Sequence, residues 1–367
     1  MDATHIEPSE FSRRRELVSK AAAEQGIDAL LICSRGGGTL DRYGHVAYLT
    51  NYYSSFPYIP DLPGFWSIRG HSFVFLTRHG EERLVADTPY LEGCHIEADN
   101  IVVTDAVMDE VLSLLSSLDA NSRVGIVGMD TLPASAFAAI VEHAPDIDLV
   151  DAESILSKQR SVKTPGEIAR LAAAADLGSR TIEAMMRAAR PGATHGDVVA
   201  AGLQVLIPAG GILYNSFMAS GTGGASPKIC RSSFPTWSSK RPLEEGDWLR
   251  LGISGVLDGY CFDVSRSRAI GRASPEQVAA FEAAIDVVET GISAIRPGVT
   301  AGQIASAGIE RQKDLGFELK GVFSGLGHGI GMGWDSPWLV PHDQTPLVPG
   351  MVINVEKTLM KNGFLGD

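Results

Sequence analysis

Three residues in the C-terminal half carry side chains that bind divalent metals or transfer protons. Asp263 ends a Gly-Tyr-x-x-Asp pattern, His328 lies within Gly-His-Gly-Ile-Gly, and Glu356 ends Pro-Gly-Met-Val-x-x-x-Glu. Carboxylates and imidazole are common ligands of Zn, Mn and Fe, and a neutral imidazole also transfers protons near pH 7. The patterns therefore predict a reactive centre that either holds a metal ion or performs acid–base chemistry without one.

The elements that position these residues are predicted from short patterns. Residues 246–252 and 258–266 read as two apolar strands joined by a Gly/Asp-rich turn, which is typical of a β-hairpin. Asp263 would lie on the second strand. The segments around His328 and Glu356 are predicted to be the partners of this hairpin.

The composition limits the class of protein. With 367 residues, of which 44% are hydrophobic, the chain can form large cores in two or more domains. Its apolar runs are shorter than a membrane span and its N-terminus is polar, so we expect neither a transmembrane helix nor a secretory signal. A net charge of −13 disfavours a nucleic-acid binder, and four scattered cysteines suit reduced thiols. We expect a cytoplasmic protein with a small-molecule substrate and no nucleic-acid or membrane partner.

Alternating strand and helix patterns over roughly the first 150 residues predict an α/β domain. Helical patterns cover residues 9–25 and 107–118. Strand patterns cover five further segments: 29–33, 46–49, 72–76, 83–87 and 123–128.

The second half contains an internal repeat. Arg-Pro-Gly-x-Thr-x-Gly begins at Arg190 and again at Arg296, each time between a long helical pattern and a Thr-capped helix. Seven of thirteen residues are identical between the two copies. This predicts two α–β halves related by a pseudo-two-fold axis, with a cleft between their sheets. The polar segment 155–166 precedes the first long helix and marks the domain junction.

Together, the three motifs, the repeat and the domain order resemble the pita-bread hydrolases, namely methionine aminopeptidase, aminopeptidase P, prolidase and creatinase. The resemblance implies an α/β (α+β) fold, with an N-terminal creatinase- or prolidase-like domain at residues 1–158 and a pita-bread catalytic domain at 159–367. It also implies a homodimer. Peptide-cleaving members bind two metal ions through Asp, Asp, His, Glu and Glu. The fifth ligand lies on a strand that would begin near Asp367, so we expect the native protein to continue beyond this residue.

The first of these ligand positions differs in this chain. The family's two Asp residues lie eleven positions apart, and eleven positions before Asp263 stands Gly252. The resemblance implies that the missing Asp serves one ion alone, which leaves Asp263, His328 and Glu356 to hold a single Mn, Zn or Fe ion. The alternatives are metal-free catalysis, in which His328 relays protons as in creatinase, and a protein without catalytic activity.

Two histidines that handle the peptide carbonyl in the family are also replaced here. One aligns with Lys228 at the end of a Gly/Ser-rich loop, and the other with Asp335. These two side chains would either pair with each other or bind the two charges of a zwitterionic substrate. Trp334 is expected in the pocket wall. Tyr52 belongs to an aromatic loop of the N-terminal domain and is expected to contact the substrate.

These departures predict an activity other than ordinary peptide cleavage. We expect a hydrolase that cleaves a C–N bond of a small amino-acid-like or zwitterionic compound, such as a relative of creatine or a cyclic amidine. Asp263, His328 and Glu356 would be its catalytic residues, with at most one metal ion. The alternatives are an Xaa-Pro aminopeptidase or dipeptidase, a metal-dependent lyase acting on a small zwitterion, and a non-catalytic binding protein of the same fold.

Overall fold

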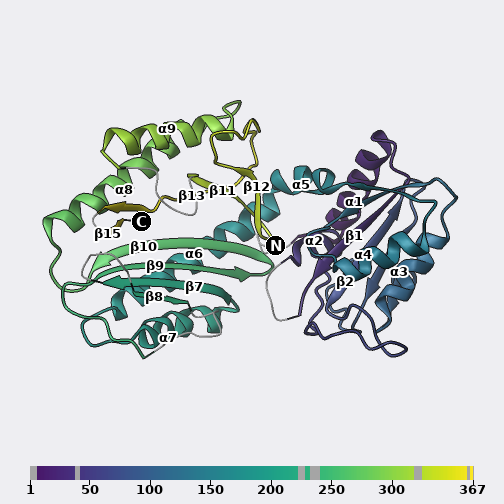
Figure 1. The fold of residues 1–367 in the computed structure, drawn as a ribbon, viewed down its shortest axis with the longest axis horizontal. Coiled ribbons are helices and arrows are strands. Elements are labelled where there is room, and N and C mark those ends of the chain that lie inside the picture. Colours follow the sequence, from purple (N-terminus) through teal and green to yellow (C-terminus); the bar gives the residue numbers. More distant parts are fainter. Residues whose placement is uncertain are drawn as a thin grey trace. The chain divides into compact units, whose positions relative to one another are not determined.

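The computed structural model describes residues 6–37, 42–221, 228–231, 240–317, 325–361 and 364–366, with the backbone alone at 228–231, 360–361 and 364–366. The chain divides into two compact units, His5–Arg160 and Ser161–Asp367 (Figure 1). None of the helices in the described part of the chain combines the length and the apolar character that a membrane crossing needs.

The N-terminal unit is built on a six-stranded mixed sheet with the order β4-β3-β2-β1-β5-β6. The central strand β1 runs antiparallel to β2 and parallel to β5. The strands are β1 (Ala29–Arg35), β2 (His71–Thr77), β3 (Glu82–Ala86), β4 (Ile101–Val103), β5 (Arg123–Val127) and β6 (Asp148–Asp151). The helices are α1 (Pro8–Glu24), α2 (Gly44–Thr50), α3 (Val107–Ser116), α4 (Ala134–His143) and α5 (Glu153–Ser161), with a 3-10 turn η1 (Ala98–Asn100).

The core of this unit follows from strand alternation. Ala29, Leu31 and Cys33 lie on one face of β1 and join α3 and α4 in a single buried cluster. The helices α1 and α2 also contact β1. Most of the helices and strands predicted for the N-terminal unit are present at or near their predicted bounds.

One predicted strand of the N-terminal unit is wrong. Residues 46–49 belong to the helix α2, whose seven residues are all buried. The backbone N–H of Asn51 donates to the carbonyl of Ala47, and Asn51 adopts a left-handed conformation with φ 59°, which ends the helix. A four-residue apolar run fits both a buried strand and a buried helix, so periodicity could not separate them.

The C-terminal unit contains three small sheets with the orders β10-β9-β7-β8, β12-β11-β13 and β14-β15. Its helices are α6 (Pro165–Ala188), α7 (His195–Leu206), α8 (Pro275–Ala294) and α9 (Ala301–Asp314), with a 3-10 turn η2 (Ile207–Ala209). The strands are β7 (Ile212–Gly221), β8 (Lys228–Arg231), β9 (Trp248–Leu257), β10 (Tyr260–Ala269), β11 (Gly327–Ile330), β12 (Trp334–Trp338), β13 (Ile353–Val355), β14 (Leu359–Lys361) and β15 (Phe364–Gly366).

The internal repeat is reproduced in three dimensions. Thr194 begins α7 and Thr300 begins α9, each through a capping box. Thr194 also forms an isolated β-bridge with Pro242, and Thr300 forms the same bridge with Pro346. The two halves therefore share the helix start and the isolated bridge at its first residue, which supports the predicted duplication.

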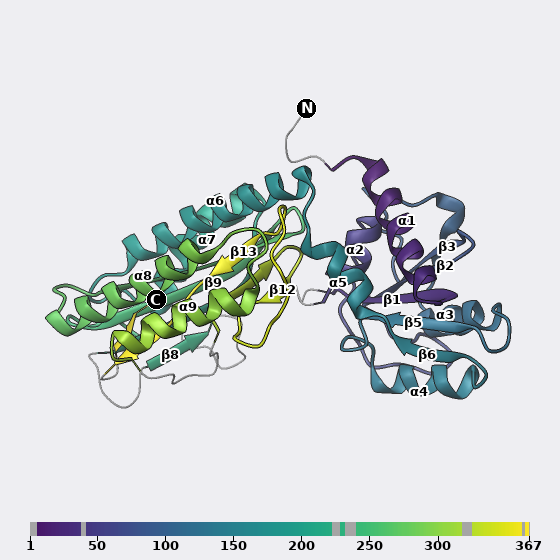
Figure 2. The same cartoon turned by 90° about the horizontal axis from the view of Figure 1, so that it is seen from above.

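The predicted hairpin is β9 and β10, joined by a tight turn. Asp258 and Gly259 both have positive φ, 49° and 81°, as an Asp-Gly turn between twisted strands requires. Leu249, Leu251 and Ile253 pack against α6 and α7. The intervening residues of β9 therefore face the opposite side of the sheet, where Figures 1 and 2 show α8 and α9. This opposite side carries the candidate site.

Candidate active site

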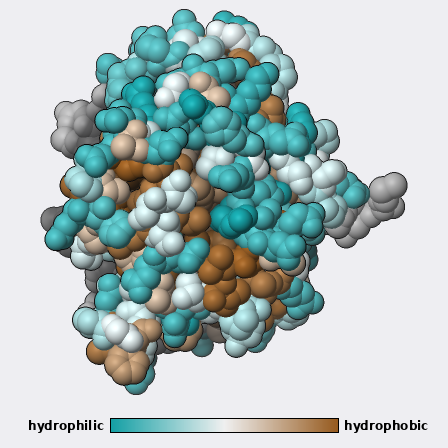
Figure 3. Space-filling view, turned by 90° about the vertical axis from the view of Figure 1, so that its right-hand side faces the viewer, coloured by the Kyte–Doolittle hydropathy of each residue, from teal (hydrophilic) through white to brown (hydrophobic). Residues whose placement is uncertain are grey.

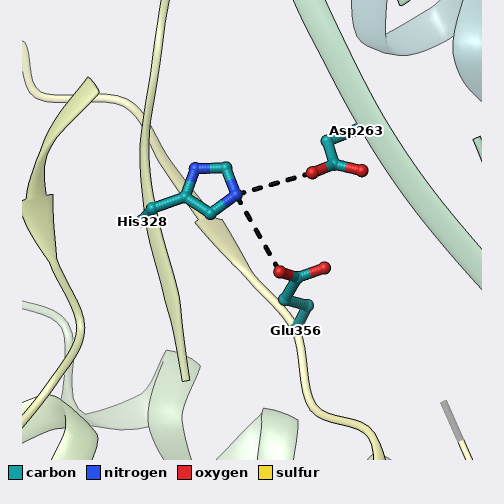
Figure 4. A group of neighbouring side chains, drawn as sticks. All are labelled: Asp263, His328 and Glu356. Atoms are coloured by element: carbon teal, nitrogen blue, oxygen red, sulfur yellow. Dashed lines mark ion pairs between the residues drawn. The ribbon is translucent and has the colours of Figure 1, made fainter. Parts of the chain in front are cut away.

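Asp263, His328 and Glu356 meet in the C-terminal unit (Figure 4). Nε2 of His328 lies 3.5 Å from Oδ2 of Asp263 and 3.9 Å from Oε1 of Glu356. Asp263 comes from β10, His328 from β11, and Glu356 directly follows β13. His328 is 2% exposed, whereas the two carboxylates are partly accessible. The structure thus brings together the three residues whose motifs predicted a reactive centre.

Glycines on both sides of His328 allow β11 to fit between its neighbours. A Cβ added to Gly327 would lie 1.9 Å from the carbonyl oxygen of Asn354 on β13, and Gly327 has a φ of +140°. A Cβ on Gly329 would lie 2.4 Å from the carbonyl oxygen of Ser336 on β12. Both contacts are with backbone, which cannot move aside. The glycines of the His328 motif are therefore required by close strand packing.

The hydrogen bonding of His328 fixes which ring nitrogen faces the carboxylates. Nδ1 lies 2.8 Å from the carbonyl oxygen of Gly329, and because a carbonyl only accepts, Nδ1 carries the proton. Nε2 is buried and has no hydrogen-bond partner among the described residues. In the neutral ring, the Nε2 lone pair therefore points between Asp263 and Glu356.

The pKa of His328 reflects two opposing effects. Burial lowers it, while the Asp263 carboxylate, the Gly329 carbonyl and the charge of Glu356 raise it, and the result is a pKa above the ordinary value of 6.5. Two carboxylates close together favour a positive charge at Nε2 or beside it. The centre is therefore suited to a cation.

Two tryptophans of β12 lie beside the centre. The Nε1–H of Trp334 donates a hydrogen bond of 2.9 Å to Oδ2 of Asp263. The His328 ring lies 6.1 Å from the Trp334 ring and 5.5 Å from the Trp338 ring, measured between centroids. Trp334, which was predicted to line the pocket, thus lies near His328 and orients Asp263.

Two family profiles cover almost all of the chain. The metallopeptidase family M24 matches residues 169–366, and the creatinase/prolidase N-terminal domain matches residues 14–162. The chain belongs to the M24 family. It is a hydrolase of this family, with the N-terminal domain found in creatinase and prolidase.

The similar proteins of this family differ in their substrates. The ectoine hydrolase of Halomonas elongata is 25% identical, over 94% of this chain and 88% of the relative. The Xaa-Pro dipeptidase of Pyrococcus furiosus is 25% identical over 70% of each chain. Among solved structures, the dipeptidase PepE from Mycobacterium ulcerans has a TM-score of 0.77 at 24% identity, covering 99% of this chain and 92% of that chain. The last likeness establishes the fold alone.

The candidate centre of this M24 hydrolase fits a divalent metal ion. The ligand atoms of Asp263, His328 and Glu356 all lie within 4.8 Å of one another. Two ligands of a tetrahedral ion at about 2.1 Å from the metal lie about 3.4 Å apart, close to the shorter distance in this centre. An unpartnered, buried Nε2 facing two carboxylates is the donor set that Zn, Mn and Fe accept.

Asp335 has a partner that the sequence did not reveal. Nζ of Lys163 lies 3.5 Å from Oδ2 of Asp335, and both side chains are almost fully buried. Lys163 is held by a backbone hydrogen bond from its N–H to the carbonyl of Gly350. A Cβ on Gly331 would lie 2.2 Å from Oδ2 of Asp335, so the glycine makes room for this carboxylate. The Asp335 carboxylate is therefore already neutralised by a lysine.

Lys228 and Tyr52 are the other two residues that were predicted to contact the substrate. The side chain of Lys228 lies outside the described residues, and only its place on β8, as the partner of Ser220, is given. Tyr52 is 2% exposed, and its hydroxyl hydrogen-bonds with Asp87 and Thr88 inside the N-terminal unit. Its aromatic ring thus belongs to the core of this unit.

Other aromatic residues of the N-terminal unit are exposed. Phe65 is 67% exposed and Tyr58 47%, both in the segment between α2 and β2. Figure 3 shows apolar patches among hydrophilic side chains on the surface of this unit. The aromatic loop predicted from the sequence therefore exposes Phe65 and Tyr58, whereas Tyr52 is buried.

Proposed function

We propose that this chain is a hydrolase that cleaves a C–N bond of a small amino-acid-like or zwitterionic compound, using one divalent ion held by Asp263, His328 and Glu356. The observation that carries the proposal is the orientation of His328: its Nδ1–H is used by the Gly329 carbonyl, and its buried Nε2 faces two carboxylates. Similarity to ectoine hydrolase supports a small substrate. The absence of both peptide-handling histidines at positions 228 and 335 supports a substrate other than a peptide.

The roles of the residues follow from their surroundings. When bound, a divalent ion would supply an acidified water and offset the charge of the two carboxylates. Glu356 is the more accessible carboxylate, so it can position this water or stabilise a positive charge that develops on the leaving nitrogen. Trp334 orients Asp263 through its indole N–H, and the Gly329 carbonyl holds His328 in the Nδ1–H tautomer.

Metal analysis tests the proposed centre. The purified full chain is dialysed with Mn, Zn or Fe, and its bound metal is measured by mass spectrometry. We expect about one ion per chain, and loss of that ion in His328→Ala and Glu356→Ala. Full activity in a chelated protein that holds no metal would contradict the single-ion proposal and favour metal-free acid–base catalysis.

A substrate panel tests the reaction. Ectoine, creatine and Xaa-Pro dipeptides are incubated with the metal-loaded protein, and release of the product amine is measured. We expect hydrolysis of a small zwitterion and none of the Xaa-Pro dipeptides. Cleavage of an Xaa-Pro dipeptide at a comparable rate would replace the proposal with a dipeptidase. An elimination product without uptake of water would replace it with a lyase.

We propose further that the protein is a homodimer, because the resemblance to its family implies one. Light scattering on the purified chain, coupled to size-exclusion chromatography, measures its molar mass. A mass of one chain at all concentrations would contradict the dimer.

The cysteines support a cytoplasmic location, which we also propose. Cys33, Cys94 and Cys261 are free thiols in the described structure, as expected in a reducing compartment. Fractionation of cells that express the tagged chain tests this location.

A further inference from the structure

The strand that carries His328 is anchored just before it begins, at Gly325 and Leu326. The Leu326 side chain is fully buried against both α8 and α9, beside Gly291 and Gly308. A Cβ added to Gly291 would lie 2.3 Å from Cδ2 of Leu326, and a Cβ added to Gly308 would lie 2.7 Å from the same atom. These two glycines therefore leave the space that Leu326 fills.

The segment that carries Glu356 binds both anchor residues. The backbone N–H of Glu356 donates to the carbonyl of Leu326 over 2.9 Å. Nζ of Lys357 donates to the carbonyl of Gly325 over 3.0 Å. These two bonds join the segment after β13 to the segment before β11. The distance of 3.9 Å between Oε1 of Glu356 and Nε2 of His328 (Figure 4) therefore depends on how the two segments are joined.

The ammonium of Lys357 is buried, which is unusual for a contact with a single carbonyl. Lys357 is 7% exposed, and within the described part of the chain its ammonium forms no ion pair. Lys163, another buried lysine of this unit, has the Asp335 carboxylate 3.5 Å away. A buried charge without a carboxylate partner costs stability. A methionine of similar length would fill the same space without this cost, so the ammonium contributes something other than stability.

We propose that Lys357 is a positioning residue for the metal centre, whose hydrogen bond to Gly325 holds Glu356 at ligand distance from His328. This inference rests on the proposed function, because a metal ion is what the two ligands would share. By charge alone, a nearby ammonium would repel a cation and weaken its binding. The benefit of Lys357 is therefore geometric. Residues that orient metal ligands commonly change metal affinity about 10–100-fold when they are replaced.

The test compares Lys357→Met with the wild-type full chain. Mn affinity is measured by titration with detection of the free ion, and the melting temperature is measured on chelated protein. We expect Mn to bind about 10-fold more weakly to the variant. The melting temperature should change by less than about 4 °C, because the unpaired Gly325 carbonyl and the removed ammonium have opposite effects on stability. A lysine that served stability alone would show the reverse pattern.

Three further variants separate geometry from charge and from folding. Lys357→Arg keeps a cation that donates hydrogen bonds, so it should recover part of the Mn affinity. Lys313→Met removes an exposed lysine of α9 as the matched control for the lost charge, and its Mn affinity should equal or exceed that of the wild type. If Lys357→Met fails to fold, Lys357→Gln carries the same expectation. Mn affinity at or above the wild-type value in the folded variant overturns the inference.

A metal-free measurement keeps this inference distinct from the proposed function. Hydrogen exchange of the Glu356 amide is followed on chelated protein, because this N–H binds the Leu326 carbonyl next to the Lys357 contact. Exchange should be faster in Lys357→Met and unchanged in Lys313→Met. If the wild type binds no metal, faster exchange would leave Lys357 as the residue that holds Glu356 beside His328 and remove the single-ion proposal. One ion in both proteins, with equal affinity and equal exchange, would keep the single-ion proposal and remove the role of Lys357.

Discussion

The indole N–H of Trp334 donates to Oδ2 of Asp263, the same oxygen that lies 3.5 Å from Nε2 of His328. Trp334 on β12 thus orients a carboxylate on β10 toward an imidazole on β11. Residues that hold metal ligands in place commonly change metal affinity 10–100-fold when replaced. This relationship gives the first prediction.

Replacing Trp334 with Phe keeps an aromatic ring near His328 and removes the hydrogen bond to Asp263. We expect metal affinity to fall about 10-fold, measured by titration with Mn and detection of the free ion. Trp338→Phe is the matched control, because the Trp338 ring also lies near His328, 5.5 Å away between centroids, and this replacement keeps the Trp334–Asp263 hydrogen bond. Equal affinities of the two variants would show that the hydrogen bond does not position Asp263.

Removing the charge of Lys163 should destabilise the C-terminal unit. In Lys163→Met, the buried Asp335 carboxylate loses the cation 3.5 Å away, which costs about 3–5 kcal/mol when one partner of a buried pair is removed. Thermal unfolding monitored by circular dichroism measures the loss. The exposed pair Asp176–Arg180 is the control, and Asp176→Asn should change stability by less than about 0.5 kcal/mol. A double variant, Lys163→Met with Asp335→Leu, should recover much of the loss.

The stability of this unit should fall in acid because of His195. Burial, assisted by the charge of Arg241, lowers the pKa of His195 to about 4, and its Nδ1 is buried without a partner among the described groups. Between pH 6.5 and 4, the unfolded chain binds a proton at this residue and the folded chain does not. Folding therefore weakens as pH falls through this window, by up to about 3 kcal/mol, and the loss from His195 stops below pH 4.

The variant His195→Gln tests this pH dependence, because its amide can still bond with Ser220, which lies 3.2 Å from Nε2 in the wild type. Unfolding midpoints are compared at pH 7 and pH 4.5, with chelator present so that metal release does not contribute. The variant should lose less stability than the wild type over this range. An equal loss in both proteins would place the acid sensitivity elsewhere.

Restoring a carboxylate at position 252 should change the number of bound ions only if Arg250 is also replaced. In Gly252→Asp, the new carboxylate lies two residues from Arg250 on β9 and therefore on the same side of the strand. It should pair with Arg250, so the metal content should stay near one ion per chain. The combination Gly252→Asp with Arg250→Met should bind a second ion, measured by mass spectrometry of dialysed protein. Two ions in the single variant would show that Arg250 does not neutralise the new carboxylate. Gly252→Ala serves as the control.

Local chemistry made much of the C-terminal unit predictable from sequence. Thr164, Thr194 and Thr300 each begin a helix through a capping box, and the Asp258-Gly259 turn joins β9 to β10. Such signals involve residues within four positions of one another. The three motifs also placed Asp263, His328 and Glu356 in one centre, because each of them lies in a pattern of strand and glycine residues.

The tertiary structure alone decided the partners of these residues. Lys163 meets Asp335 from a position 172 residues away, and Trp334 reaches Asp263 from a different sheet, so no local spacing could reveal either contact. The strand register likewise places Gly252 diagonally to Asp263 and beside Phe217, which gives Arg250 its position. Sequence determined which side chains are present and the local turns that present them. Long-range packing determined which charges they meet, because burial and distance set the strength of every electrostatic contact.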